Sequence, residues 1–190
     1  QKSDEMGVVF STILKYKPGP KNIFQSGFSY HLLKYQFTDS IRSGTGFMVN
    51  LDQTGNYNLL KSHIQWQHKF TNDLITYSGL HFMFFTFNNK YSIEPRIGLK
   101  WSFFSRHSLN FGLGLHGQLL PRMFYIVESE ALPGMTDPFN KNLGFSKSLH
   151  FVFGYNYLIG ENLRLKFESY YQYLFNIPVK RGDPVYSMLN

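Results

Sequence analysis

The sequence predicts an all-β fold, an antiparallel transmembrane β-barrel with about eight strands present. Apolar and polar residues alternate over many consecutive positions, which indicates strands with one apolar and one polar face. Aromatic residues make up 18% of the 190 residues and charged residues only 16%, against roughly 25% charged in soluble domains. The alternating segments also reach the 9–11 or so residues that a bilayer-spanning strand needs, whereas soluble strands average about 5–6.

The N-terminal half contains four of the predicted strands. Val8–Tyr16 and Ile23–Phe37 alternate weakly, and Leu74–Phe87 is apolar on both faces near its end. Leu60–Phe70 alternates clearly, because its even-numbered positions carry most of its large apolar residues and its odd-numbered positions carry Lys, His and Gln. This strand is therefore expected to face lipid on one side and water on the other.

The C-terminal half contains the four strands with the clearest pattern. In Tyr91–Phe103, odd-numbered residues from position 93 are apolar, and even-numbered residues are polar, charged or glycine. Ser108–Leu119 and Leu149–Tyr157 place Leu, Phe and Tyr on one face opposite polar or small residues. Leu163–Phe175 sets Leu, Phe and Tyr against Arg, Lys, Glu, Tyr and Gln. Bulky apolar faces opposite small or charged faces favour a lipid-facing wall with a wet lumen over a soluble sandwich.

The predicted connections alternate between short and long. Turn-forming residues make short connections at Pro18–Lys21, Thr71–Asp73, Ser105–His107 and Gly160–Asn162, with a further short turn at Asn88–Lys90. Long loops are expected at Thr38–Tyr57 and Pro121–Lys147 and in the tail from Asn176. Short turns at one rim and long loops at the other are typical of outer-membrane barrels. We expect Pro121–Lys147 to capture ligand and to be dispensable for folding.

Several segments resemble, in the same order, the barrel of TonB-dependent outer-membrane receptors in the form common in Bacteroidetes. The clearest is LHFVFGYNYLIGENLRLKFESYYQYLFNIPV, Leu149–Val179. Upstream, YSIEPRIGLKW (Tyr91–Trp101), GLGLHGQLLP (Gly112–Pro121) and NKNLGFSKS (Asn140–Ser148) resemble the same family. The resemblance implies a bacterial outer-membrane receptor that takes up a nutrient with energy coupled through TonB.

The resemblance also implies that residues 1–190 form only part of a larger plugged barrel, without the plug domain. Its partners would be outer-membrane lipid, the plug domain, TonB, an unidentified nutrient and a surface lipoprotein. Two alternatives remain. One is a complete eight-stranded barrel with a binding or lipid-modifying role, and the other is a structural subunit of an envelope complex.

Charged and polar residues on the predicted inner face are the candidate site residues. A lumen-facing position is expected for Glu94, Arg96, Lys100, His116, Arg164, Lys166 and Glu168. They would face the plug or the permeant, unless they only pair with one another across strands.

The sequence predicts no catalytic, cofactor-binding or metal-binding residues. His63 and His68 fall on opposite faces of one strand, and Ser105-Arg106-His107-Ser108 lies in a tight turn. The chain has no cysteine, which excludes cysteine-ligated metal sites. The net charge of +7 comes from scattered Lys and Arg rather than a cluster, so no nucleic-acid partner is expected. We therefore expect that the chain is not an enzyme.

Overall fold

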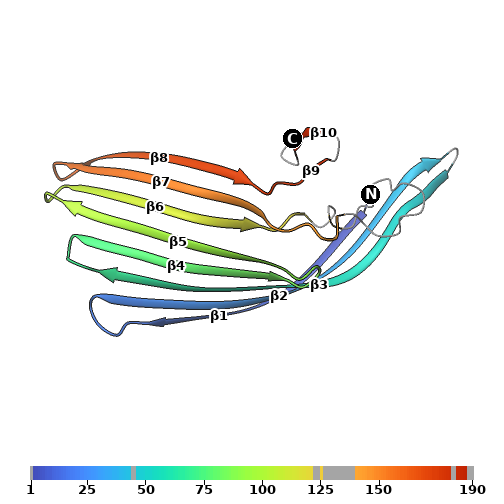
Figure 1. Ribbon diagram of the computed structural model, residues 1–190, viewed down its shortest axis with the longest axis horizontal. Coiled ribbons are helices and arrows are strands. Elements are labelled where there is room, and N and C mark those ends of the chain that lie inside the picture. The colour runs from blue at the N-terminus through green and yellow to red at the C-terminus, as the bar shows by residue number, and fades with distance from the viewer. Residues whose placement is uncertain (1, 44–45, 122–124, 126–139, 181–182, 188–190) are drawn as a thin grey trace.

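The computed structural model describes residues 2–43, 46–121, 125, 140–180 and 183–187, and eight of its strands form one antiparallel sheet in sequence order (Figure 1). The strands are β1 (Lys2–Tyr16), β2 (Asn22–Ser43), β3 (Gly46–Lys69), β4 (Leu74–Phe85), β5 (Lys90–Phe103), β6 (His107–Gln118), β7 (Ser146–Ile159) and β8 (Leu163–Phe175). The predicted all-β antiparallel fold is confirmed, including the number of strands in the sheet.

The eight-stranded sheet is open at both sides. Each strand pairs with its neighbours in sequence, and no pairing joins β1 to β8 within the part of the chain that the structure describes. These strands therefore form a curved wall rather than the closed eight-stranded barrel that the sequence left as an alternative. Within the same residues, no helix is long and apolar enough to cross a membrane.

Short turns gather at one edge of the sheet, as predicted. The connections after β1, β3, β5 and β7 lie together at the left of Figure 1. The β5–β6 turn is closed by a 3.0 Å hydrogen bond from the His107 N–H to the Phe104 carbonyl. The turn after β7 contains Gly160 at φ +72°, a conformation that glycine adopts without steric cost.

The expected loop at Thr38–Tyr57 is wrong, because these residues continue β2 and β3 as one long hairpin. Thr38 pairs with Asp52, and the ladder extends through a register shift at Asp39/Ser40 to Ser43 and Gly46. This hairpin projects beyond the rest of the sheet (Figure 1). Polar residues reduce the tendency of a segment to be buried but not the ability of its backbone to pair, so a largely polar segment can continue a strand.

Two other boundaries differ from the sequence-based expectation. β1 begins at Lys2 rather than Val8, because the extension of β2 provides a partner as far as Thr38. The tail contains a separate two-stranded sheet, in which β9 (Val179–Lys180) pairs with β10 (Asp183–Ser187). The tail is therefore partly ordered by backbone pairing and is not all loop.

The register divides the sheet into an apolar face and a polar face. Cross-strand neighbours such as Ile64 and Leu80, or Leu113 and Phe151, share the apolar face. Its large side chains stay exposed, with Ile64 at 55% and Leu165 at 53%. In a water-soluble protein such a continuous surface would be costly, so this face is suited to contact with an apolar medium.

A hydrophobic cluster covers part of the polar face at the end of the sheet away from the short turns. It joins Tyr57 and Leu59 of β3 and Met83 and Phe85 of β4 to residues of the β6–β7 connection, Leu120, Tyr125 and Phe145. Asn88 Nδ2 donates hydrogen bonds to the carbonyls of Lys141 (3.0 Å) and Leu143 (2.7 Å). The connection therefore packs against the wall.

This cluster changes the expectation for Pro121–Lys147. Its last two residues, Ser146 and Lys147, already belong to β7. Tyr125 and Phe145 are 2% and 4% exposed, so removing the whole segment would also remove part of the buried cluster. Positions 122–124 and 126–139 of the predicted loop lie outside the described residues.

Candidate functional site

The register places all seven predicted site residues on the polar face of the sheet. Three lie on β5, one on β6 and three on β8. Glu94, Arg96 and His116 lie farther from the short turns, whereas Lys100 and Arg164 lie near them. The lumen-facing position of these residues stays a prediction.

Lys166 and Glu168 form an exposed ion pair on β8. The Lys166 Nζ and Glu168 Oε1 atoms are 2.7 Å apart, with the two side chains 50% and 57% exposed. The two charges thus neutralise each other along one strand rather than across strands, and exposed pairs of this kind contribute about 0–1 kcal/mol.

Glu94 is the centre of a buried polar network. Its Oε2 accepts hydrogen bonds from His81 Nδ1 and Arg96 Nη2, both at 2.9 Å. Its Oε1 accepts from the Ser92 hydroxyl at 2.9 Å and from the Gly117 N–H at 2.8 Å. Glu94 and Ser92 are each only 1% exposed. Because a carboxylate only accepts, His81 must carry its proton on Nδ1 here.

The local sequence explains why β5 and β6 separate at this point. Pro95 has no N–H to give to the ladder, and the pairing of the two strands ends at Arg96 and Gly114. The Gly117 N–H therefore turns to the Glu94 side chain. A Cβ at Gly117 would lie 2.7 Å from Glu94 Oε1 and even closer to the Ser92 hydroxyl, so glycine is required for this approach.

The network extends to β7 through Lys147, whose Nζ donates a hydrogen bond to the Ser92 hydroxyl. We call the set His81, Ser92, Glu94, Arg96, Gly117 and Lys147 the Glu94 network. It ties four neighbouring strands together on the polar face, and every polar group around the buried carboxylate has a partner. Such a network specifies one arrangement of the strands.

A pair of histidines lies on the polar face next to this network. The rings of His116 and His150 are 4.2 Å apart between centroids. His150 is also held by the Ser148 hydroxyl at 2.7 Å and by the Tyr170 hydroxyl at 3.2 Å. Across the described residues, no group of three His, Cys, Asp or Glu side chains is arranged to hold a metal ion.

Sequence reasoning identified Glu94, Arg96 and His116 but missed Ser92, His81 and Lys147 as their partners. Ser92 and Glu94 share a face of one strand, yet their contact with His81 and Lys147 depends on the register of β4, β5 and β7. Alternation alone does not give that register. Pro95 is the one residue quoted in the sequence pattern that indicates this site, because a proline inside a strand marks an interrupted ladder, where side chains can take over the hydrogen bonds.

Comparison with known proteins gives a fold relationship. No family model matches the sequence, and no characterised protein matches it by sequence. Among solved structures, the siderophore receptor PirA from Acinetobacter baumannii superimposes with a TM-score of 0.64 at 13% identity, over 83% of this chain and 25% of that chain. The chain therefore has the same fold as part of that receptor's β-barrel, and we call this fold the receptor-barrel fold.

Two mutants of the ferric enterobactin receptor PfeA from Pseudomonas aeruginosa show the same receptor-barrel fold. Their TM-scores are 0.60 and 0.61 at 12% identity, again over 83% of this chain and 25% of theirs. The chain thus spans about a quarter of the length of the receptors it resembles. At this level of identity the similarity describes the fold of the wall and not its ligand.

Proposed function

We propose that this chain forms part of the wall of a receptor in the bacterial outer membrane, which takes up a nutrient with energy coupled through TonB. The observation that carries the proposal is the two-faced antiparallel sheet with a receptor-barrel fold. Its apolar face leaves large side chains exposed, and contact with lipid would remove their cost in water. Its polar face, with the Glu94 network, would line the lumen.

The partners in this proposal follow from the sequence resemblance. They are outer-membrane lipid, a plug domain, TonB, a surface lipoprotein and the nutrient itself. Because the similar solved structures are receptors for siderophores, ferric siderophores are the first nutrient class to test. The Bacteroidetes form of the family rests on the sequence resemblance alone, and nothing in the proposal requires an enzymatic step.

The orientation of the wall can be tested with two adjacent residues of β3. Residues 1–190 contain no cysteine, so Ile64→Cys and Gln65→Cys each introduce a single attachment point for a spin label within this segment. Ile64 lies on the apolar face and Gln65 on the polar face. In isolated outer membranes, molecular oxygen, which dissolves in lipid, should relax the spin label at position 64. A water-soluble nickel chelate should relax the spin label at position 65. Equal or reversed accessibilities would contradict the proposed facing.

Transport can be tested in cells that lack either this protein or TonB. Uptake of radioactive iron supplied as ferric enterobactin should fall in both strains and return when the intact gene is restored. If a panel of ferric siderophores, cobalamin, oligosaccharides and peptides is taken up equally with and without the protein, the transport proposal is wrong.

A further inference from the structure

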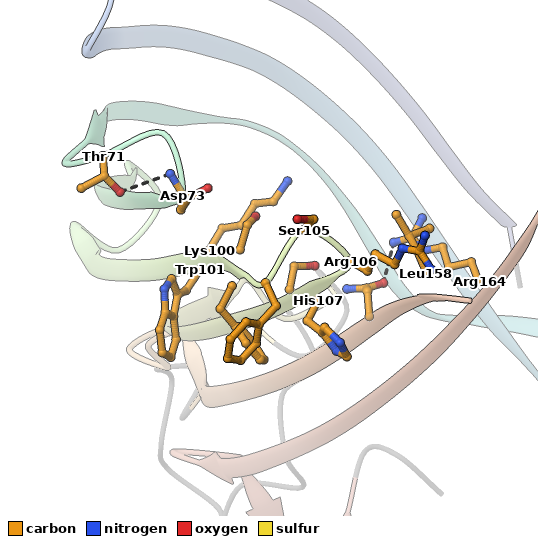
Figure 2. Close-up of a pocket in the computed structure, with 14 residues that line it drawn as sticks. Thr71, Asp73, Lys100, Trp101, Ser105, Arg106, His107, Leu158 and Arg164 are labelled. Carbon is orange, nitrogen blue, oxygen red and sulfur yellow. Dashed lines mark hydrogen bonds between the residues drawn. The ribbon is translucent and has the colours of Figure 1, made fainter. Parts of the chain in front are cut away.

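A pocket lies at the short-turn edge of the sheet, away from the Glu94 network. It has a volume of about 710 Å³ and is bordered by the β3–β4 and β5–β6 turns and the ends of β7 and β8. We call it the rim pocket. Figure 2 shows Arg106 and Arg164 toward one end and Thr71 and Asp73 toward the other, with Lys100 between them.

The charged side chains of the rim pocket are mostly positive. Lys100, Arg106 and Arg164 line it together with a single acid, Asp73. Elsewhere on the polar face the basic side chains Arg96 and Lys166 have carboxylate partners, Glu94 and Glu168.

By contrast, in the described part of the chain no carboxylate lies within 4.0 Å of the basic groups of Lys100, Arg106 or Arg164. The rim pocket thus concentrates positive charge that the described protein groups leave unneutralised, and an anion would supply the missing partner.

The frame of the pocket is held in place by backbone hydrogen bonds. The Arg106 carbonyl accepts from the Leu158 N–H at 2.9 Å, and the Asp73 carbonyl accepts from the Ser102 N–H at 2.8 Å. Arg164 Nη2 donates to Asn156 Oδ1, which orients its guanidinium. A frame that is already ordered reduces the entropy that a ligand must lose on binding.

We propose that the rim pocket binds a phosphate group. Two guanidinium groups and an ammonium group match the charge and the hydrogen-bonding geometry of phosphate oxygens, and Ser102, Ser105 and Ser108 add hydroxyl donors. The volume accommodates a diphosphate or a phosphate ester. This binding goes beyond the proposed transport and does not depend on it.

The phosphate has two physical sources. One is a phosphate-bearing solute that reaches the polar face. The other is a phospholipid headgroup, because the exposed aromatic side chains Trp101 and Phe104 border the pocket and such side chains gather at membrane surfaces. The chemistry that the pocket recognises is the same in both cases.

The test uses the full chain as it occurs in the cell, purified in dodecyl maltoside micelles, whose sugar headgroup carries no phosphate, and titrated calorimetrically with inorganic pyrophosphate. Saturable binding is expected, with Arg106→Gln and Arg164→Gln each weakening it roughly tenfold, as loss of a charge-assisted hydrogen bond implies. Lys17→Gln is the matched control, since Lys17 is an exposed cation in the β1–β2 turn at the same edge but outside the pocket. Asp73→Asn should tighten binding.

Phosphatidylglycerol nanodiscs distinguish the two sources. A headgroup is the source if two results are obtained. Pyrophosphate should bind more weakly in these nanodiscs, and native mass spectra should show phosphatidylglycerol retained by the wild type but not by the double variant Arg106→Gln/Arg164→Gln. Unchanged pyrophosphate binding identifies a free solute. The proposal is overturned if neither pyrophosphate binding nor lipid retention is seen. It is also overturned if Lys17→Gln weakens pyrophosphate binding as much as the pocket variants do, or if the protein binds a glutamate-rich peptide but not pyrophosphate. If Arg164→Gln fails to fold, Arg106→Gln in the turn still decides the outcome.

Discussion

Replacement of Glu94 by alanine should destabilise the folded wall by about 2–5 kcal/mol, because it leaves buried hydrogen-bond donors without an acceptor. The carboxylate accepts from four donors, and its removal leaves them without an acceptor. Arg96 is 46% exposed and can turn to water. The Ser92 hydroxyl and the Gly117 N–H cannot do so as easily, and each unsatisfied buried donor costs about 1–3 kcal/mol.

Glu168→Ala is the matched control on the same face, because its carboxylate pairs with Lys166 in an exposed position. It should cost less than about 1 kcal/mol. Urea unfolding of the reconstituted protein, followed by tryptophan fluorescence, measures both free energies of unfolding. Glu94→Gln, which keeps the volume but loses the charge, should fall between the two. Equal costs for Glu94→Ala and Glu168→Ala would refute the assignment of Glu94 as the buried centre of the network.

Three further predictions concern other parts of the chain. Gly117→Ala should destabilise the fold much more than Gly112→Ala in the same urea assay, since a Cβ at Gly117 would lie 2.7 Å from a carboxylate oxygen, whereas at Gly112 the nearest atom would be 3.8 Å away. Leu165→Arg should cost about 2–4 kcal/mol if this position lies near the bilayer midplane, and Lys166→Leu much less; equal costs would contradict the facing of β8. Burial raises the pKa of Tyr125 to about 12. Because the neutral phenol is favoured in the fold, its stabilisation, on the order of 2 kcal/mol, is present below pH 10 and lost as the pH rises toward 12. Tyr125→Phe should remove that part of the pH dependence, and an unchanged slope would show that the phenol is accessible to water when folded.

The faces of the strands could be predicted from the sequence because alternation is a local property. Ile93 and Glu94 fall on opposite faces whichever strands lie beside β5. The Glu94 network could not be predicted in the same way, since it requires His81 to stand opposite Glu94 across the β4–β5 ladder. That register depends on turn geometry and packing along the whole hairpin.

The extension of β2 and β3 into Thr38–Tyr57 was not predicted, for a different reason. The residues around Thr38 and Asp52 include many polar residues and glycines, which are common in loops. Backbone pairing needs no apolar face, only a partner strand in register, which each half of this hairpin provides to the other. Similarly, the packing of Tyr125 against β3 and β4 has no periodic signal, because it comes from a connection rather than a strand.

The order of the strands has a consequence for how the wall assembles. Since every ladder of the eight-stranded sheet joins strands that are consecutive in sequence, each ladder can grow outward from its own connection, and each new pair of residues closes only a slightly longer loop. The ladder between β6 and β7 differs from the others in the sheet because its connection, residues 119–145, is long. By the logarithmic law of loop closure this costs about 2 kcal/mol more than closing the turn at 160–162. The strands should therefore first pair within two groups, β1–β6 and β7–β8, and the two groups should then join. Burial of Tyr125 and Phe145 against the first group would offset the entropy of joining them.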